Sequence, residues 1–373
     1  MGCESVSGNI SEKERFLLDM IRKNPYVSQQ EIAEALGLSR PSIANLISGL
    51  TKKGYIVGRA YILKESQPII CIGGANIDRK FYLKNKGQLG TSNPVKSTQS
   101  PGGVARNIAE NLGRLGMESV LLTACGGDSD WKFIEDASSL YMDLNYVAQI
   151  PGLATGSYSA VLDSSGDLII ALADMDVYDS ISTEVVQQQE RLLSNAKCIV
   201  ADLNCPKETL QFIAQFANAH SVPLAFIPVS SPKMNRLPDD LSGVTWLITN
   251  RDESETFFNF KVESKEDWMQ VVEKWLALGI TNVVVTNGKR GAMFGNKEEG
   301  VFHHPAIETE QMVDVTGAGD AFSSAVIYSW LEGKPLQNIA KAGIVNASKT
   351  LQSSYTVRQD LSASQLTKDM EEL

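Results

Sequence analysis

Hydrophobic positions follow two different periods along this chain, and the change falls near residue 67. Between residues 16 and 50, apolar residues recur at helical spacing in three short segments. From Ile69 onward, short uninterrupted apolar runs alternate with segments of helical period. Uninterrupted runs are typical of strands buried on both faces, as in a parallel sheet. We therefore expect two domains, residues 1–66 and residues 67–373.

The large region alternates strand and helix candidates. The strand candidates are PIICIGG, ESVLLTACGG, AKCIVADLN, VPLAFIPVS, VTWLITN and TNVVVTNG. The helix candidates lie at about 103–116, 182–195, 206–219, 265–279, 318–332 and 336–351. This pattern predicts an α/β fold whose helices cover both faces of one sheet, with ligands beyond the carboxyl ends of the strands. Segments at about 79–100 and 154–176 read as strands instead and predict a small β lid.

The N-terminal region predicts three helices and a hairpin. Ser28 to Glu31 is a capping box that opens the second helix, Gly37 ends that helix, and Ser39 can cap the third. A short hairpin is expected about Gly58-Arg59. This order resembles the winged helix-turn-helix family of regulators, which implies a third helix in the major groove of operator DNA. The alternative is a three-helix bundle used only for dimerisation or packing.

Charge supports a separate role for the N-terminal region. Residues 1–66 carry nine Lys and Arg against seven Asp and Glu, whereas the whole chain has a net charge of −10. The stretch from Ser39 to Lys64 holds five basic residues and no acidic one. The DNA-contact candidates are the polar and basic side chains on or just after the third helix: Arg40, Ser42, Asn45, Lys52 and Lys53.

Composition excludes several other classes of protein. No apolar run approaches the ~20 residues of a transmembrane helix, and the start MGCESVSGN lacks the apolar core of a signal peptide. Five scattered cysteines and three histidines show no metal-type spacing, so we expect reduced thiols and a cytoplasmic protein.

The segment DVTGAGD carries the most informative chemistry. Gly317, Ala318 and Gly319 let a backbone turn press close to a ligand, and the following helix N-terminus favours a phosphate. Asp320 stands where it can take a proton from an attacking hydroxyl. An anion site beside a carboxylate base predicts phosphoryl transfer to an alcohol.

Two earlier motifs offer polar groups to a sugar. Asn76 and Asp78, two apart on extended chain, should point the same way and can clasp vicinal hydroxyls; the alternative is a capped turn. Gly102, Gly103 and Asn107 belong to a glycine turn that opens a helix, which is by itself a common arrangement.

Two later motifs follow strands. Asn250 and Glu253 can organise Mg²⁺ and its waters near a triphosphate, or can simply start a helix. Thr286 and Gly288 can lie along phosphates, or can form a strand-to-strand turn.

Taken in order, GGVARNIAENLGRLG, NRDE and DVTGAGDAFSSA resemble the signatures of the PfkB, or ribokinase-like, carbohydrate kinase family. The resemblance covers about 69–365 and implies a three-layer α/β/α sandwich with a β lid. It implies Asp320 as catalytic base, residues 317–319 as an anion hole, and ATP with Mg²⁺ as cosubstrate and ion. It further implies Asn346 near the adenine. Asp314 and Thr316 fall where relatives bind a monovalent cation, which makes K⁺ a candidate.

The same resemblance narrows the substrate. GGANIDRK, GGVARN and SYSAVLDSSGDLIIALADMDVYD are similar to the pseudouridine kinase branch. Val104 stands where ribokinases usually have Lys, which disfavours free ribose. We expect phosphorylation of the 5′-hydroxyl of pseudouridine, with Ser157 or Ser159 facing the base unless they only alternate toward solvent. The alternatives are a kinase for inosine, cytidine or ribose, and a transcription regulator that senses a nucleoside. A winged helix that reads a palindrome also favours a homodimer.

Overall fold

The computed structural model describes residues 10–58, 67–308 and 315–372, and the chain divides into two compact units, Met1–Ser66 and Gln67–Leu373. Most of the predicted hairpin about Gly58-Arg59 lies outside the described residues. None of the helices in the described ranges is both long and apolar enough to cross a membrane.

The N-terminal unit contains three helices, α1 (Glu12–Lys23), α2 (Gln29–Leu36) and α3 (Arg40–Lys52). The predicted capping box of Ser28 and Glu31 is present, and Gly37 ends α2 with φ of 62°. The helices enclose an apolar core that includes Leu17, Ile32, Ile43 and Leu50. Phe16 of α1 is 48% exposed, because the inward face of α1 passes through Leu17, Leu18 and Ile21.

The large unit is built on a sheet that contains eight strands among the described residues, in the order β14-β13-β12-β11-β10-β9-β1-β4. Its central strands run parallel, and only β12–β13 and β13–β14 pair antiparallel. The strands are β1 (Ile69–Ile72), β4 (Ser119–Leu122), β9 (Cys198–Asp202), β10 (Leu224–Ile227), β11 (Trp246–Asn250), β12 (Asn282–Thr286), β13 (Ala292–Asn296) and β14 (Gly300–His304). The predicted α/β fold is confirmed, with an antiparallel edge that the apolar runs did not show.

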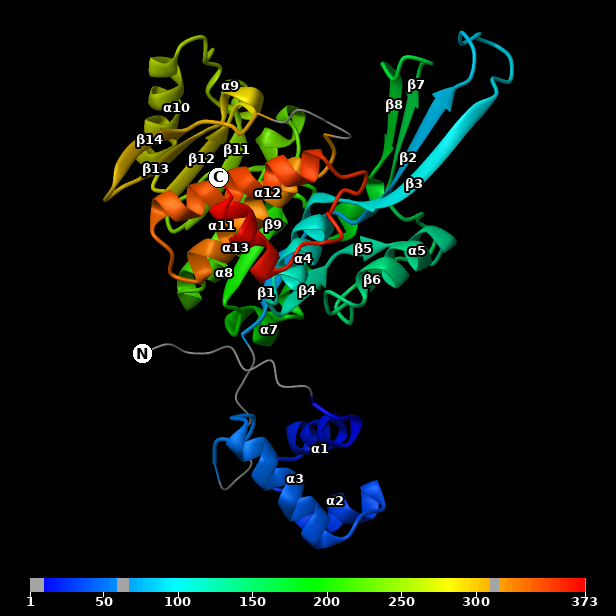
Figure 1. The fold of residues 1–373 in the computed structure, drawn as a ribbon, viewed down its shortest axis with the longest axis vertical. Coiled ribbons are helices and arrows are strands. Elements are labelled where there is room, and N and C mark those ends of the chain that lie inside the picture. The colour runs from blue at the N-terminus through cyan, green and yellow to red at the C-terminus, as the bar shows by residue number, and fades with distance from the viewer. Residues whose placement is uncertain (1–9, 59–66, 309–314, 373) are drawn as a thin grey trace. The chain divides into compact units, whose positions relative to one another are not determined.

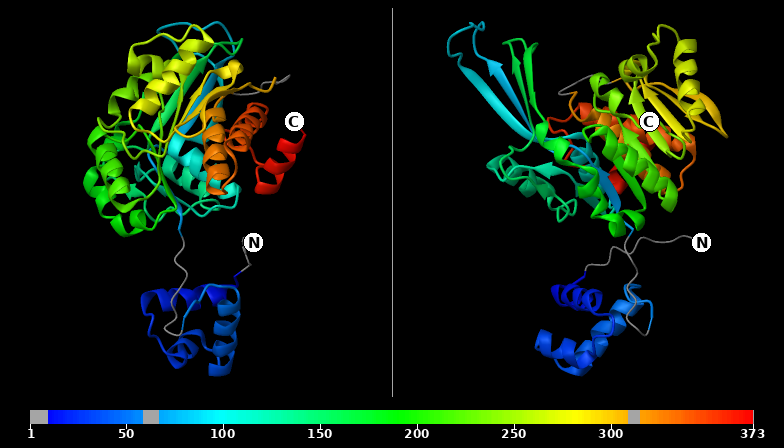
Figure 2. Two further views of the ribbon diagram at one scale, coloured as in Figure 1. Left: turned by 90° about the vertical axis from the view of Figure 1, so that its left-hand side faces the viewer. Right: turned by 180° about the vertical axis from the view of Figure 1, so that it is seen from behind.

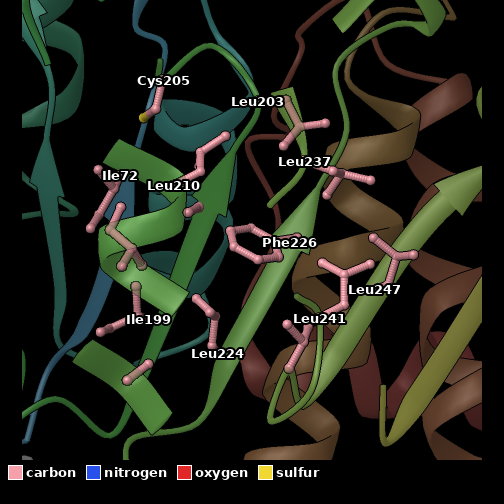
Figure 3. Packing of buried hydrophobic residues seen from close by; sticks show 14 of the residues in the cluster. Ile72, Ile199, Leu203, Cys205, Leu210, Leu224, Phe226, Leu237, Leu241 and Leu247 are labelled. Atoms are coloured by element: carbon pink, nitrogen blue, oxygen red, sulfur yellow. The ribbon is translucent and has the colours of Figure 1, made fainter. Parts of the chain in front are cut away.

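Helices cover both faces of this sheet (Figures 1 and 2). Alternate residues of β1 enter different cores: Ile70 and Ile72 belong to the core that also contains residues of α8 and α10, whereas Ile69 and Cys71 belong to the core that contains residues of α4, α11 and α12. Figure 3 shows the first of these cores, with Phe226 of β10 at its centre. The helices are α4 (Val104–Arg114), α5 (Ser129–Ser138), α6 (Thr183–Gln187), α7 (Glu190–Ser194), α8 (Lys207–His220), α9 (Arg251–Phe258), α10 (Lys265–Ala277), α11 (Ala318–Leu331), α12 (Leu336–Leu351) and α13 (Ala363–Glu371). The predicted helix at 182–195 is split into α6 and α7.

The two segments that broke the alternation pair with each other in a second sheet, of order β3-β2-β7-β8. It comprises β2 (Asn76–Leu83), β3 (Val95–Gly102), β7 (Ser157–Leu162) and β8 (Leu168–Asp174), while β5 (Ala124–Cys125) and β6 (Ala148–Gln149) form a separate pair. The second sheet projects from the carboxyl-terminal side of the main sheet as a lid (Figure 1).

Candidate functional site

One buried carboxylate joins the carboxyl ends of β1 and β9. Asp202, the last residue of β9, is 1% exposed. It accepts hydrogen bonds from the backbone N–H groups of Gly74 and Ala105, each at 2.9 Å, and of Asn204 at 2.8 Å. Gly74 follows β1 and Ala105 lies in the first turn of α4, so Asp202 ties both segments to β9. Burial raises the pKa of Asp202, and the three N–H groups oppose that rise.

Two glycines make this junction sterically possible. Gly73 has φ of 145°, and a β-carbon there would overlap the Asp202 carboxylate. Gly103 has φ of 96°, and a β-carbon there would overlap the carbonyl of Gly74. Since L-residues with side chains rarely adopt these angles, α4 can begin this close to β1 only with glycine before it.

The two polar residues of the first motif lie at the start of β2 and point the same way. The amide of Asn76 donates to the carboxylate of Asp78 at 2.6 Å. Gly102, the register partner of Asn76 on β3, leaves room for that carboxylate, because a β-carbon at Gly102 would overlap it. Asn76 and Asp78 therefore lie where the lid joins the main sheet, next to the turn that contains Gly102 and Gly103.

The helix that follows the glycine turn and the helix that follows the DVTGAGD segment contact each other directly. Nδ2 of Asn107 on α4 donates to Oδ2 of Asp320 on α11 at 2.8 Å. Asp320 keeps partial exposure as a residue, but desolvation of its carboxylate raises its pKa to about 7. The Asn107 hydrogen bond opposes this rise, whereas the charges of Asp202 and Asp78 add to it. A carboxylate with this pKa can act as a proton acceptor near neutral pH.

The start of α11 offers backbone N–H groups to an anion. Gly317 has φ of 83° and lies against the carbonyl of Thr356, where a β-carbon would overlap it, whereas Gly319 has no neighbouring atom within 4 Å of its β-position. Ala318, between them, is the first residue of α11. The first-turn N–H groups of a helix lack partners within the helix. Lys80 of the lid donates to the Thr316 hydroxyl at 3.3 Å. Asp314 lies outside the described residues, so the K⁺ site stays a prediction.

The later motifs lie side by side at the carboxyl ends of β11 and β12, where Asn250 and Thr286 are register partners. Asn250 and Glu253 form a capping box, and the Glu253 carboxylate accepts from Asn250 N and from the Thr249 hydroxyl, each at 2.9 Å. The ordinary helix start is therefore present. Gly288 begins a short turn between β12 and antiparallel β13, which matches the strand-to-strand alternative.

Three residues lie elsewhere than the sequence suggested. Asn346 is fully buried, donates to the carbonyl of Ala321 at 2.8 Å and accepts from Arg358 at 3.0 Å, so it has no surface to offer an adenine. Ser157 and Ser159 share a lid face with Arg79, which binds Asp130 of α5.

Tyr158 lies on the opposite face of the lid. It is the register partner of Asp78, and register partners project from the same side of a sheet. This register puts Ser157 and Ser159 on the lid face opposite Asp78, so a contact of either serine with the base stays a prediction, and Tyr158 is the residue of β7 that shares a face with Asp78.

The predicted DNA contacts of the N-terminal unit are only partly available. Arg40, Asn45 and Lys52 are exposed, and the hydroxyl of Ser42 lies 2.8 Å from that of Ser39 at the start of α3. Lys53 pairs with Glu14 of α1 at 2.8 Å, and this ammonium helps to hold the pKa of Glu14 at about 2.

Comparison with known proteins assigns families to the two units. The model of the pfkB family carbohydrate kinases matches residues 66–362, and a winged helix-turn-helix DNA-binding model matches residues 10–57. The chain belongs to the pfkB family of carbohydrate kinases. This pfkB kinase is accordingly a phosphotransferase that acts on an alcohol group.

Individual relatives agree with the kinase family, and a solved structure agrees with the fold. The chain is 32% identical to a pseudouridine kinase of Escherichia coli over 303 residues, covering 80% of this chain and 95% of that protein. It is 27% identical to an uncharacterized sugar kinase of E. coli, covering 95% and 97%. The ribokinase of Arabidopsis thaliana, solved with ribose and ATP, superposes with a TM-score of 0.72 at 20% identity, covering 82% of this chain and 99% of that structure.

Asp202 was missed by sequence reasoning, although one signal was present. It is a carboxylate that directly ends an uninterrupted apolar run, CIVAD, at a predicted site edge. Nearby, Lys233 donates to the side chain of Asn204, and Arg236 donates to the Asn204 carbonyl at 2.6 Å. These contacts hold the segment after β10 against the end of β9.

Replacing Asp202 by Asn should destabilise the pfkB kinase by about 1–3 kcal/mol. A carboxylate has two acceptor oxygens and an amide has one, so at least one buried N–H group would face an NH₂ group. Urea unfolding followed by circular dichroism measures the change. Asp239→Asn, at an exposed ion pair with Lys207, is the control and should shift the midpoint little. Equal midpoints for the two variants would refute the structural role of Asp202.

Proposed function

We propose that this pfkB kinase transfers the γ-phosphoryl group of ATP to the 5′-hydroxyl of a nucleoside, with pseudouridine as the preferred acceptor. The 2.8 Å hydrogen bond between Asn107 and Asp320 carries the proposal. This hydrogen bond joins Asp320, the proposed proton acceptor, to the helix that starts at the glycine turn proposed to bind the sugar. Phosphoryl transfer needs this proximity, because the enzyme contributes chiefly positioning and charge stabilisation.

Each group then has one role. Asn76 and Asp78 hold sugar hydroxyls, and Asp320 takes the proton of the attacking hydroxyl. The N–H groups at the start of α11, around Gly319, stabilise the charge that develops on the transferred group. Bound Mg²⁺ would supply positive charge to the triphosphate and would keep much of its water shell. The exposed amide of Asn250, at the same sheet edge, suits a hydrated ion better than the buried Glu253 does.

The choice of pseudouridine rests on the 32% identical relative with that name and on the lid. Val104, at the start of α4, is partly buried against the core. Because it stands where ribokinases usually have Lys, this position offers no cationic group to a free sugar. Tyr158 shares the lid face of Asp78 and supplies an aromatic surface for a base, with a hydroxyl that can donate or accept.

Purified full-length protein with Mg²⁺ and ATP should produce ADP fastest with pseudouridine. The comparison set is uridine, cytidine, inosine, adenosine and ribose, with K⁺ present throughout. Mass spectrometry should find a 5′-phosphate. Preference for another acceptor would replace the substrate and keep the mechanism, whereas inactivity on every acceptor would remove the proposed reaction.

The kcat/KM of this reaction should rise with pH through about 7. Asp320 acts as a base only when ionised, and its pKa is raised to about 7, so protonation below that pH removes the active form.

Asp320→Asn should lower kcat by about 10²- to 10⁴-fold and leave ATP affinity nearly unchanged. Asp179→Asn, at an exposed pair with Arg236, is the matched control. A variant Asp320→Asn that turns over normally would exclude the base role.

We further propose that the N-terminal unit binds operator DNA through α3, as the family match over residues 10–57 supports. Arg40 and Lys52 are exposed and basic, and their contacts would be to phosphates.

Selection of duplexes from a random pool should therefore yield a bound sequence. On that duplex, Lys52→Ala should reduce the slope of log affinity against log salt by about one. Lys13→Ala, on exposed α1, should leave the slope unchanged. Failure to enrich any duplex, or equal slopes for both variants, would count against this surface.

A further inference from the structure

Behind the contact between Asn107 and Asp320 stands a buried guanidinium that no proposed step yet uses. Arg106 is 1% exposed and lies on α4 beside Asn107. Its Nε donates to the Ser138 hydroxyl at 3.1 Å, its Nη2 donates to Glu110, and its Nη1 donates to Oδ1 of Asn107 at 2.9 Å. The same Asn107 amide donates through Nδ2 to Asp320.

The order of these contacts permits one orientation of the Asn107 amide. A guanidinium has donors only, and an ionised carboxylate has acceptors only. An amide between them must turn its oxygen to Arg106 and its NH₂ to Asp320. The two ends of the amide are similar in size, so the shape of the pocket does not by itself choose between them. The charge of Arg106 makes the choice.

We propose that Arg106 is a positioning residue of the kinase: it holds the Asn107 amide so that its NH₂ group always faces the proton-accepting carboxylate of Asp320. This inference rests on the proposed role of Asp320. It adds a residue that touches neither substrate nor ATP but sets the hydrogen bonding of the base.

Burying the Arg106 guanidinium costs desolvation free energy, which favours a functional rather than a stabilising role for this residue. A buried ion pair stabilises a fold weakly or not at all, because desolvation offsets the attraction. Glu110 already has a second partner, since Arg114 donates to it at 2.7 Å. The Glu110 carboxylate would thus remain paired without Arg106, which leaves the contact to Asn107 as the distinctive one.

Loss of Arg106 should alter the titration of Asp320. Without the guanidinium, the amide can turn its oxygen toward Asp320, which repels the ionised carboxylate and favours the protonated one. The charged groups that bear on Asp320 are Asp202 of β9, Asp78 of β2 and Arg106 itself. The first two raise its pKa and Arg106 lowers it, so removal of Arg106 acts in the same direction as an amide flip.

The test compares Arg106→Met with Arg114→Met in the full-length protein. Both changes remove a guanidinium that binds Glu110, and only the first removes a contact with Asn107. The acid limb of kcat/KM against pH should move up by about one unit in Arg106→Met, with about tenfold less kcat/KM at pH 6.5. Arg114→Met should keep the wild-type limb. Coincident limbs for the two variants would overturn the proposal.

A second readout needs no turnover. The ¹³C signal of the Asp320 carboxyl group, assigned by its loss in Asp320→Asn, gives the titration directly. Its midpoint should rise in Arg106→Met and not in Arg114→Met. If the wild type phosphorylates no acceptor, the proposed function fails while this measurement still decides the role of Arg106. Should Arg106→Met not fold, Arg106→Met/Glu110→Gln removes both buried charges and carries the same comparison.

Discussion

The site depends on one interaction, the acceptance of three backbone hydrogen bonds by the buried carboxylate of Asp202. Two of its donors, Gly74 and Ala105, lie 128 and 97 positions away in the chain. A neutral side chain could not satisfy three donors at once, and a charge without them would be too costly to bury. The carboxylate therefore fixes where the lid and α4 begin relative to the end of β9. The pair of Asn76 and Asp78 and the contact of Asn107 with Asp320 both depend on those starting points.

Local patterns predicted most of the fold. Apolar runs located the parallel strands, a capping box located the start of α2, and glycines located the sharp turns, because each signal acts within a few residues. Three helices are missing from the predicted set: α5, α13, and α9, whose start was only one of two alternatives for Asn250 and Glu253. The antiparallel edge formed by β13 and β14 also escaped prediction, since a parallel and an antiparallel partner demand similar apolar residues.

The site was predicted less completely, for a physical reason. Motifs indicate which residue types suit a chemistry, but not which side chains pair across long separations. Asn107 and Asp320 are 213 positions apart, and their direct contact is a property of the packed helices. The face of Tyr158 depends on strand register, because a shift of one residue would bring Ser157 or Ser159 to the same side. Asn346 was expected near the adenine, but its hydrogen bonds join α12 to α11 and to Arg358. A polar residue in a sequence motif can therefore have a structural role that the sequence does not reveal.

Three acidic residues gather here, and their partners separate their chemistry. Asp202 has its oxygens occupied by backbone N–H groups, so it is structural. Asp78 accepts from the side-chain amide of Asn76 at the start of the lid strand β2, whereas the donors to Asp202 are backbone groups. Asp320 accepts from Asn107 through one oxygen, Oδ2, and the like charges of the other two carboxylates oppose its ionisation. Burial of the Asp320 carboxylate is the largest cause that raises its pKa to about 7, the two neighbouring charges add to the rise, and the hydrogen bond from Asn107 opposes it. The orientation of the Asn107 amide therefore matters for the pKa of Asp320.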